Sequence, residues 1–465
     1  MSEKKIYKPR PISGFPEWLP EVRRVEQQWL DHIRATFESY GYSSIETPAV
    51  EELAVIEAKG GDGGADVDKE VYVIERLHKE EGDKEARLAL HFDQTVPLAR
   101  YVAQHFNELD YPFKRYQMQK VWRGERPQAG RFREFYQCDI DVINPDNLPL
   151  HFDAEMPAIM WEILSSLPGM ENEKIQIRIS NRKILLGFLD SLHFHTKDGA
   201  TVKLTDNLKA AVVRDIDKLE KLGKEVTLAR IESTCQELGF NVHAFIAPFI
   251  NLCEKKIRTA EELEKVLLES AEIDTNNPML KEGIEELSFV LKQLTHLPKD
   301  AVVADISIVR GLDYYTGTVY ETVFTADPGY GSICSGGRYD DLASNYINRK
   351  LPGVGISIGF SRLFARLHTQ KKLDTARKSP TDVLVVIPSE ERRALSADTA
   401  RALRERGLNV EMYHAARKIP DQMKYASKKG IPFVWFPPFE DGKEHEVKNM
   451  TTGEQTKADV ASWKP

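Results

Sequence analysis

Two long runs of alternating residues, separated by a single loop, constrain the fold of this chain more than any other feature. The runs are FKRYQMQKVWRGE from residue 113 and EFYQCDIDVIN from residue 134, with the loop RPQAGRFR between them. Successive side chains of a β-strand point to opposite faces, so a period of two indicates two strands. The short connection indicates that they pair antiparallel, and we therefore predict a β-hairpin.

One face of the predicted hairpin is polar in both arms. In the first arm this face consists of Arg115, Gln117, Gln119 and Arg123. In the second arm it consists of Phe135, Gln137, Asp139 and Asp141, and the opposite face consists of Tyr136, Cys138, Ile140 and Val142. A polar sheet face is either solvated or forms the floor of a binding site, and the alternation alone does not decide between the two.

The rest of the chain divides into regions of different pattern. Apolar residues at spacings of three and four predict a helix over residues 19–40, which ends at Gly41. We expect short strands at 71–77 and 86–92 and a helix from Thr95 to Phe106. Helical patterns dominate from about 190 to 300, and strand patterns return from AVVADISIV to GVGISIGFSRL. After a polar linker, strands and helices alternate to the end of the chain, which is typical of a small α/β domain with parallel strands.

Length and composition exclude several classes of protein. A chain of 465 residues with 41% hydrophobic and 29% charged residues is typical of a soluble protein of several domains. No apolar run is long enough for a membrane helix, and the first residues lack the pattern of a signal peptide. The four cysteines are widely spaced, as expected for buried thiols in a reducing compartment, so we predict a cytoplasmic protein. The net charge of −8 leaves nucleic-acid binding to a local basic surface.

The segment DISIVRGLDYYTGTVYETVF, residues 305–324, carries polar residues that a turn does not require. We expect strands at DISIV and TVYETVF, joined by a polar connection with glycines at 311 and 317. The connection contains Arg310, Asp313, Tyr314 and Tyr315. A turn needs glycine for its backbone, but it has no need of an arginine, an aspartate and two tyrosines, which indicates a functional role.

Other polar residues have the chemistry of a nucleotide and amine site. Arg123 and Arg310 can each neutralise a phosphate or carboxylate, and Glu125 can hold Mg²⁺ through oxygen. Phe135 can stack on a flat ring, and the carboxylates of Asp93 and Asp141 accept N–H donors. The alternative is that such residues form salt bridges of the framework. Neither a phosphate-binding loop of the type G-x-x-x-x-G-K-[ST] nor a convincing dinucleotide-binding motif is present.

Five segments together resemble one enzyme family. GYSSIETPAVE, VWRGERPQAGRFREFYQCDID and GVGISIGFSRL resemble, in chain order, motifs 1, 2 and 3 of class II aminoacyl-tRNA synthetases. The more specific peptides RGLDYYTG and CSGGRYDDL resemble the two signature peptides of the histidyl-tRNA synthetase family. The resemblance spans nearly the whole chain. It implies that ATP converts L-histidine to histidyl-adenylate and pyrophosphate, and that the histidyl group then passes to the 3′ end of tRNA(His). It also implies Mg²⁺ with the ATP, and a homodimer.

The same resemblance assigns roles to individual residues. Arg310 and Arg123 match arginines at the α-phosphate of ATP and would be the catalytic groups, and Arg310 would also lie beside the substrate carboxylate. Asp141 and Tyr315 match residues that recognise the imidazole ring. The implied histidine-binding residues are Asp93, Thr95, Arg123, Gln137, Asp141, Arg310, Tyr314, Tyr315 and Tyr339.

The implied ATP-binding residues are Arg123, Glu125, Arg131, Phe135 and Arg362. Phe135 and Arg362 would enclose the adenine, and Arg131 would contact the γ-phosphate. Mg²⁺ would accompany ATP near Glu125 without a site made of protein alone. Arg126 and Gln128, in the loop of motif 2, would contact the tRNA acceptor stem.

The resemblance also implies the fold and its division. We expect an α+β catalytic domain of the class II synthetase type, built on an antiparallel sheet, with a helical insertion and a C-terminal α/β anticodon-binding domain. Its parts would be a first catalytic segment, the insertion, a second catalytic segment, a linker and the anticodon-binding domain. Their expected ranges are 1–190, 191–300, 301–368, 369–380 and 381–465.

The chain departs from the family's pattern at three positions of interest. Many bacterial members have glutamate where this chain has Asp93 and Asp141, so the pocket walls must lie closer to the substrate or use water. An arginine is common in the family where this chain has His91, which leaves the role of that position open.

Three other functions remain to be weighed against this one. The first is the non-catalytic, synthetase-like regulatory subunit of ATP phosphoribosyltransferase, which generally lacks an anticodon-binding domain. The second is a class II synthetase for proline, threonine or glycine, against which the signature peptides argue. The third is a nucleic-acid-binding scaffold without catalysis. Pyrophosphate exchange with each amino acid separates them.

Overall fold

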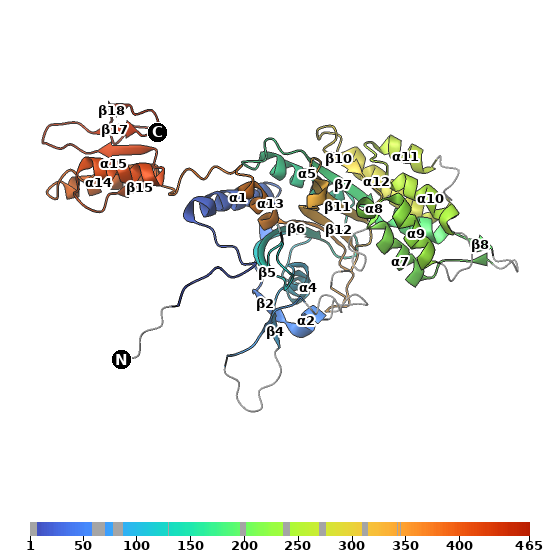
Figure 1. Cartoon of the computed structure of the whole chain (residues 1–465). Coiled ribbons are helices and arrows are strands. Elements are labelled where there is room, and N and C mark those ends of the chain that lie inside the picture. The colour runs from blue at the N-terminus through green and yellow to red at the C-terminus, as the bar shows by residue number, and fades with distance from the viewer. Residues whose placement is uncertain are drawn as a thin grey trace. The chain divides into compact units, whose positions relative to one another are not determined.

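The structure is a computed structural model. It describes residues 7–57, 70–77, 87–128, 130–195, 201–235, 242–268, 276–308, 315–341, 343–344 and 346–465. The chain divides into two compact units, one of residues 1–16 and 32–366 and the other of residues 17–31 and 367–465 (Figure 1).

The main sheet of the first unit has eight strands among the described residues. In spatial order they are β1 (Ser43–Ser44), β5 (Phe113–Trp122), β6 (Glu134–Ile143), β13 (Gly353–Ile358), β12 (Cys334–Tyr339), β11 (Thr318–Phe324), β7 (Ile175–Asn181) and β10 (Val302–Ala304). β1 is parallel to β5 and β10 is parallel to β7, whereas all other neighbours are antiparallel. The predicted antiparallel-sheet architecture is confirmed.

The predicted hairpin is formed by β5 and β6, which pair along their whole length. Cys138, Ile140 and Val142 are buried on one face, as the alternation predicts. The polar face is buried as well: Arg115 and Gln117 are fully covered, and Asp139 is 6% exposed. This polar face is therefore not a solvated surface. Arg123 lies one residue beyond the end of β5 and not within the strand.

Helices form at the sequence positions that the apolar spacing predicts. In α1 (Pro20–Ser39) the residues Val22, Val25, Trp29, Ile33 and Phe37 are all buried. The helix ends where Gly41 adopts a φ of +78°, and its N–H donates to the carbonyl of Glu38. α5 (His151–Ser166) packs against β12 and β13 with an apolar face. α4 (Thr95–Gln104) ends two residues before the predicted end.

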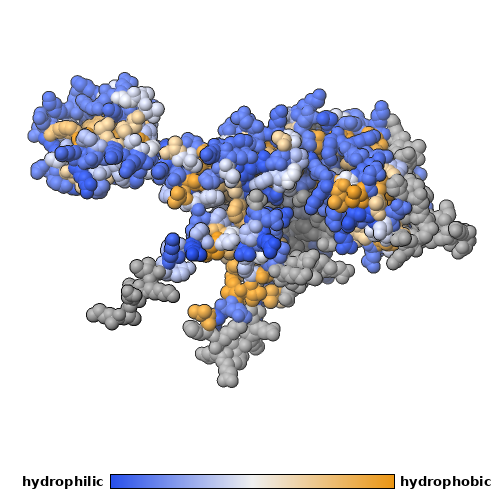
Figure 2. All heavy atoms as spheres, viewed as in Figure 1, coloured by the Kyte–Doolittle hydropathy of each residue, from blue (hydrophilic) through white to orange (hydrophobic). Residues whose placement is uncertain are grey.

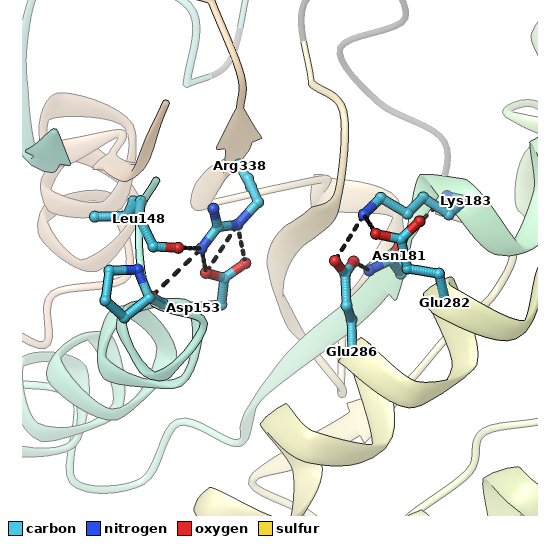
Figure 3. Close-up of polar contacts among 8 residues, drawn as sticks. Leu148, Asp153, Asn181, Lys183, Glu282, Glu286 and Arg338 are labelled. Atoms are coloured by element: carbon cyan, nitrogen blue, oxygen red, sulfur yellow. Dashed lines mark hydrogen bonds and ion pairs between the residues drawn. The ribbon is translucent and has the colours of Figure 1, made fainter. Parts of the chain in front are cut away.

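A buried ion pair ties β12 to α5. The guanidinium group of Arg338 donates to both carboxylate oxygens of Asp153, at 2.5 to 3.1 Å, and to the carbonyl of Leu148 at 3.1 Å (Figure 3). The Asp153 side chain is fully covered and that of Arg338 is 10% exposed. Because Arg338 and Tyr339 are neighbours on a strand, this pair anchors one face of β12 while Tyr339 points to the other.

The remaining elements before residue 175 are short. A three-stranded sheet has the order β2 (Val50–Glu52), β4 (Leu88–Leu90) and β3 (Val73–Ile74), and α2 (Leu53–Glu57) follows β2. The strands predicted at 71–77 and 86–92 thus exist but are only two and three residues long.

Helices dominate from residue 182 to 293, as predicted. They are α6 (Arg182–Ser191), α7 (Asp206–Ile216), α8 (Leu219–Leu222), α9 (Lys224–Thr234), α10 (Val242–Cys253), α11 (Ala260–Leu268) and α12 (Pro278–Gln293). A two-stranded sheet of β8 (Phe194–His195) and β9 (Thr201–Val202) lies between α6 and α7 in the chain. In Figure 1 the helices α7 to α12 gather at the end of the sheet that carries β7 and β10.

α6 and α12 approach closely and are joined by charge. A Cβ on Gly187 of α6 would lie 2.4 Å from the backbone nitrogen of Leu280, so the contact requires glycine. Lys183 forms ion pairs with Glu282 at 2.8 Å and Glu286 at 2.6 Å across the same interface (Figure 3).

One predicted strand is wrong. Residues 305–308 of the segment DISIV are not part of a strand, because β10 ends at Ala304 and residues 306–307 form a turn, and Val309 lies outside the described residues. The Asp305 carboxylate accepts from the backbone N–H of Ser307 at 3.2 Å and from its hydroxyl at 2.6 Å. Such local side-chain bonds give the backbone an alternative to the strand ladder. The partner run TVYETVF is β11, as predicted.

From residue 381 to its end the second unit contains a five-stranded sheet with the helices α14 and α15. The strand order is β15 (Val410–Met412), β14 (Val383–Val385), β16 (Phe433–Phe436), β17 (Glu446–Asn449) and β18 (Gln455–Lys457). β14 is parallel to β15 and β16, which confirms the predicted α/β pattern, and β17 and β18 add an antiparallel edge. The helices are α14 (Arg393–Glu405) and α15 (Ile419–Lys429), and α13 (Phe360–Thr369) precedes them in the chain.

Most of the surface drawn in Figure 2 is hydrophilic, with small apolar areas. Among the described residues, none of the helices combines the length and apolar character that crossing a membrane requires. All four cysteines are buried and carry free thiols, as predicted.

Candidate active site

A cavity of about 270 Å³ opens where β6, β12 and β13 meet the start of α13 and the loop that follows β5. Five of its lining residues were predicted to bind ATP, namely Arg123, Glu125, Arg131, Phe135 and Arg362. Gln137 of β6 and Ser357 of β13 also line it. The structure thus brings together residues that lie up to 239 positions apart in the chain.

Arg123 is held between two aromatic rings at this cavity. Its guanidinium carbon lies 4.4 Å from the centre of the Phe92 ring and 5.2 Å from that of the Phe135 ring. Its Nε donates to the carbonyl oxygen of Phe92 at 3.3 Å. Burial lowers the pKa of Arg123, and the carboxylates of Asp93 and Glu125 act against this shift. Phe92, which sequence analysis did not select, therefore fixes the position of this guanidinium group through both its ring and its backbone.

Glu125 and Arg131, both in the connection between β5 and β6, form an ion pair. Arg131 Nη1 lies 3.3 Å from Glu125 Oε2, and the two side chains are 54% and 24% exposed. Exposed pairs of this kind contribute little to stability, so both groups can reorient toward a ligand.

Arg362 is fixed at the opposite wall of the cavity by Tyr330. Its guanidinium carbon lies 4.8 Å from the centre of the Tyr330 ring, and its Nη2 donates to the Tyr330 carbonyl oxygen. The Tyr330 hydroxyl donates to the carbonyl of Arg362 at 2.8 Å. A Cβ on Gly130 would lie 2.5 Å from that hydroxyl, and Gly130 has a φ of +73°, so glycine is required there. Tyr330 is another positioning residue that sequence analysis missed.

The polar face of the main sheet continues from the cavity along β5 and β6. Asp141 lies opposite Arg115 and accepts from its Nη2 at 2.5 Å, with the two side chains 8% and 1% exposed. The hydroxyl of Tyr339 donates to the other oxygen of Asp141 at 2.9 Å. A Cβ on Gly355 of β13 would lie 2.0 Å from Asp141, so this glycine makes room for the carboxylate.

Burial dominates the protonation of this part of the face. It raises the pKa of Asp141, while Arg115 and the Tyr339 hydrogen bond oppose the shift. It also raises the pKa of Tyr315, with the carboxylates of Asp141, Asp139 and Asp93 acting in the same direction. Tyr315 therefore stays protonated and can donate a hydrogen bond.

Asp93 marks the beginning of α4. Its Oδ1 accepts from the backbone N–H groups of Thr95 at 3.1 Å and Val96 at 3.0 Å, which fixes the carboxylate at the N-terminal end of the helix. Gln94 is buried, and its amide donates to the carbonyls of Gln119 and Gln137, both at 3.1 Å. These bonds attach the start of α4 to β5 and β6.

His91 is part of the framework. It is 1% exposed, its ring lies 5.4 Å from that of Trp122, and its Nε2 bonds to the carbonyl of Lys120 at 2.7 Å. Burial lowers the pKa of His91, so the imidazole is neutral near pH 7. In the family that the sequence resembles, this position is commonly an arginine, which is positively charged. The neutral His91 does not supply that charge.

Four predicted site residues lie either in the exposed loop of motif 2 or outside the described residues. Arg126 and Gln128 are exposed in the loop between β5 and β6, where the backbone of Gln128 pairs with that of Arg131. Arg310 and Tyr314 lie outside the described residues.

The side chains around the cavity can be compared with the ligands that Mg²⁺, the metal implied by the family resemblance, requires. Among the described residues no group of three histidine, cysteine or carboxylate side chains is placed to hold a metal ion. Glu125 is a single carboxylate beside the cavity, and one carboxylate suffices for Mg²⁺ that keeps its waters and is bound through nucleotide phosphates. The residues present therefore fit Mg²⁺ arriving with a nucleotide.

Comparisons with known proteins agree with one another. The family model described as histidyl-tRNA synthetase matches residues 14–363, and that described as anticodon binding domain matches residues 382–463. The histidine–tRNA ligase of Thermobifida fusca is 53% identical over 464 residues, covering all of both chains. The crystal structure of histidyl-tRNA synthetase from Nostoc sp. PCC 7120 is 36% identical, with a TM-score of 0.82 over 98% of this chain and 97% of that one.

A more distant structure shares the fold alone. It is titled as an ATP phosphoribosyltransferase regulatory subunit/histidyl-tRNA synthetase from Bacillus halodurans and is 20% identical. Its TM-score is 0.67 over 90% of this chain and 97% of that one.

Proposed function

This chain belongs to the histidyl-tRNA synthetase family, and we propose that its cavity and polar sheet face carry out the two steps of a histidine–tRNA ligase. The observation that carries this proposal is the gathering of Arg123, Phe135 and Arg362 around one cavity, next to the buried carboxylates of β6. The cavity has the groups for a nucleotide, and the sheet face has those for an amine and an imidazole.

ATP occupies the cavity in this proposal. Phe135 and Arg362 line it and take the two faces of the adenine, by stacking and by a cation–π contact. Arg131 contacts the γ-phosphate after leaving its exposed pair with Glu125. Mg²⁺ bound with ATP near Glu125 supplies further positive charge to the phosphates.

L-Histidine lies over the polar face of β5 and β6. Asp141 and Tyr315 select the imidazole ring, and Tyr339 orients Asp141 through its 2.9 Å hydrogen bond. Asp93, Thr95 and Gln137 surround the α-amino and carboxylate groups. A substrate without imidazole N–H groups leaves buried acceptors unpaired, which is the strongest form of discrimination available to such a pocket.

The first step joins the histidine carboxylate to the α-phosphorus of ATP. One carboxylate oxygen forms the new P–O bond, and the bond to pyrophosphate breaks, giving histidyl-adenylate. Negative charge grows on the phosphate oxygens, and Arg123, already held by Phe92, meets it without reorganisation. Arg310 would contribute a second guanidinium group, on the strength of the sequence resemblance alone.

The second step transfers the histidyl group to tRNA(His). The hydroxyl of the 3′-terminal adenosine attacks the carbonyl of the adenylate, and AMP leaves. The exposed positions of Arg126 and Gln128 support contact with the acceptor stem. Residues 382–463, which match the anticodon-binding model, would bind the anticodon.

Domains, assembly and compartment follow as proposals from the same family. We place the catalytic domain at 1–190 and 301–368, the insertion at 191–300, the linker at 369–380 and the anticodon-binding domain at 381–465. The homodimer rests on the family resemblance. The four free, buried cysteines support a reducing compartment such as the cytoplasm. The regulatory-subunit alternative is not favoured, because the curated relative matches over the full chain.

The direct test is charging of tRNA. Purified protein, ATP and Mg²⁺ should attach radiolabelled histidine to a tRNA(His) transcript, and none of the other amino acids should be attached above background. Failure to charge with histidine, or charging with a different amino acid, would overturn the proposal.

A further inference from the structure

Asp139 lies on the polar sheet face between two residues with proposed roles, yet has none of its own. On β6 it is two positions from both Gln137 and Asp141, so all three side chains share one face. Gln117 lies opposite it on β5 and Ser357 lies opposite it on β13. Gln137 and Ser357 both line the cavity. A carboxylate that is 6% exposed thus lies directly beside the lining of the site.

Several acceptor atoms of the polar sheet face and of the adjoining start of α4 are buried and unused. Among the described residues, Oδ1 of Asp139 and the amide oxygens of Gln94, Gln117 and Gln137 have no hydrogen-bond partner. Each of these groups is otherwise held in place: Gln137 donates to Ser357 at 2.8 Å, and Ser357 in turn bonds to Asp139. Buried acceptors without donors are costly and rare in native proteins. Gln137 and Asp139 lie two positions apart on one face of β6 beside the cavity, so their unused oxygens indicate a ligand that carries donors. On the same face Nε and Nη1 of Arg115 are also buried without a partner in the described part of the chain.

The charges around Asp139 indicate that this ligand is a cation. Arg115 of β5 attracts the carboxylate, whereas Asp141 of β6 and Asp93 before α4 repel it. Arg123 and Tyr315 face the same region. Of these described groups, three are carboxylates and two are guanidinium groups, so a negative charge remains to be matched when all three carboxylates are ionised, which favours a cationic ligand. Burial, the largest effect, and the two acidic neighbours raise the pKa of Asp139 to about 7.

We propose that Asp139 receives the α-ammonium group of L-histidine, with the amide oxygen of Gln137 as a second acceptor. An ammonium group has three donors and a full positive charge, which matches a buried carboxylate and an adjacent amide oxygen better than the single N–H of a neutral imidazole. Asp141, at the other end of the row, already accepts from Arg115 and Tyr339. This inference rests on the proposed function and adds a substrate-binding residue to it.

A consequence is that binding of histidine releases a proton. Near pH 7 the free enzyme holds Asp139 partly protonated, and the ammonium group favours the ionised carboxylate. The proton lost on binding goes to the buffer. A residue with a merely structural role would not produce this coupling.

The test compares L-histidine with its analogue 3-(imidazol-4-yl)propionate, which lacks the amino group. Isothermal titration calorimetry measures both affinities for the wild-type protein and for Asp139→Asn. We expect Asp139→Asn to weaken histidine about 10- to 100-fold, the range for a lost charged hydrogen bond, and to leave the analogue within about twofold. Equal loss for both ligands, or unchanged affinity for histidine, would overturn the inference.

Titrations at pH 7 in two buffers of different ionisation enthalpy give the proton count. The wild type should release up to about half a proton more on binding histidine than Asp139→Asn does. Equal proton release in the two proteins would contradict the role of Asp139.

Two further variants serve as controls. Asp139→Glu retains the charge and should recover part of the preference for histidine over the analogue. Asp146→Asn makes the same chemical change at an exposed turn after β6 and should alter neither affinity. Wild-type protein that neither binds histidine nor exchanges pyrophosphate with it would reject the proposed function itself. If Asp139→Asn keeps the wild-type preference for histidine over the analogue, only this inference is rejected.

Discussion

Arg123 shows how single residues prepare the site. The Phe92 ring and carbonyl hold its guanidinium group at the cavity before any substrate is present. Preorganised charge of this kind acts mainly in the transition state, because it costs no rearrangement when negative charge develops.

We predict that Arg123→Ala lowers kcat for histidine-dependent pyrophosphate exchange by about 10² to 10³-fold, the scale seen when one charge-stabilising group is removed. The matched control is Arg126→Ala, which removes an exposed arginine from the same loop. It should leave exchange nearly unchanged. Similar exchange rates for the two variants would show that Arg123 does not act on the reacting phosphate.

The buried carboxylate of Asp139 should also affect the stability of the free protein. Its pKa rises on folding to about 7, so between pH 4 and pH 7 the folded state binds more protons than the unfolded state. The Asp139 contribution to stability is therefore most favourable at or below about pH 4 and declines until about pH 7.

We predict that Asp139→Asn is more stable than the wild type at pH 8 by on the order of 1 to 3 kcal/mol, and that the difference shrinks toward pH 4.5. Urea unfolding without ligands at both pH values measures it. A difference that grows toward low pH would mean that the ionised carboxylate is well paired in the folded protein.

At the scale of elements, the pair of Arg338 and Asp153 attaches β12, with its signature peptide CSGGRYDDL, to α5. Removing one member leaves the other charge buried without its partner, which is far more costly than losing an exposed pair.

We predict that Arg338→Met destabilises the protein by about 3 to 5 kcal/mol. Arg401→Met is the control, because Arg401 pairs with Asp398 at 3.0 Å with both side chains more than 60% exposed, and it should cost less than about 1 kcal/mol. Denaturant titrations of the two variants give both values. An equal loss of unfolding free energy in the two variants would contradict the anchoring role of Arg338.

The elements also show what could be predicted from sequence. The alternation in residues 113–143 correctly paired β5 with β6 and placed Gln137, Asp139 and Asp141 on one face, because side-chain direction has a period of two. It could not show that this face is buried, which depends on packing by distant segments. The strand predicted at DISIV failed because a local Asp305–Ser307 turn competed with it.

Contacts made through space limited the prediction of the site. Arg338 and Asp153, which form an ion pair, are 185 positions apart in the chain. The contact between Tyr330 and Arg362 depends on the conformation of a loop. Family resemblance supplied the predicted site residues, but it gave no reason to select Phe92 or Asp139. The alternation of the sequence places Asp139 on the polar face. Only the structure shows that its Oδ1 has no hydrogen-bond partner among the described residues, which makes Asp139 a candidate substrate-binding residue.

At the scale of the whole molecule, the net charge of −8 must be reconciled with binding of an anionic tRNA. Association then depends on local basic surfaces that displace counterions from the phosphates, and such binding weakens steeply with salt.

We predict that the KM for tRNA(His) in the charging reaction rises at least about tenfold between 50 and 200 mM KCl. The KM for histidine in pyrophosphate exchange, which reports a buried pocket, should change less than about twofold over the same range. A KM for tRNA that does not respond to salt would contradict phosphate contacts as the source of tRNA affinity.

The central claim is that one buried polar face chooses the amino acid while the adjoining cavity activates it with ATP. ATP–pyrophosphate exchange measured separately with each of the twenty amino acids tests both halves at once. The account predicts strong exchange with histidine and background exchange with the other nineteen. Exchange with a different amino acid, or none with histidine, would contradict it.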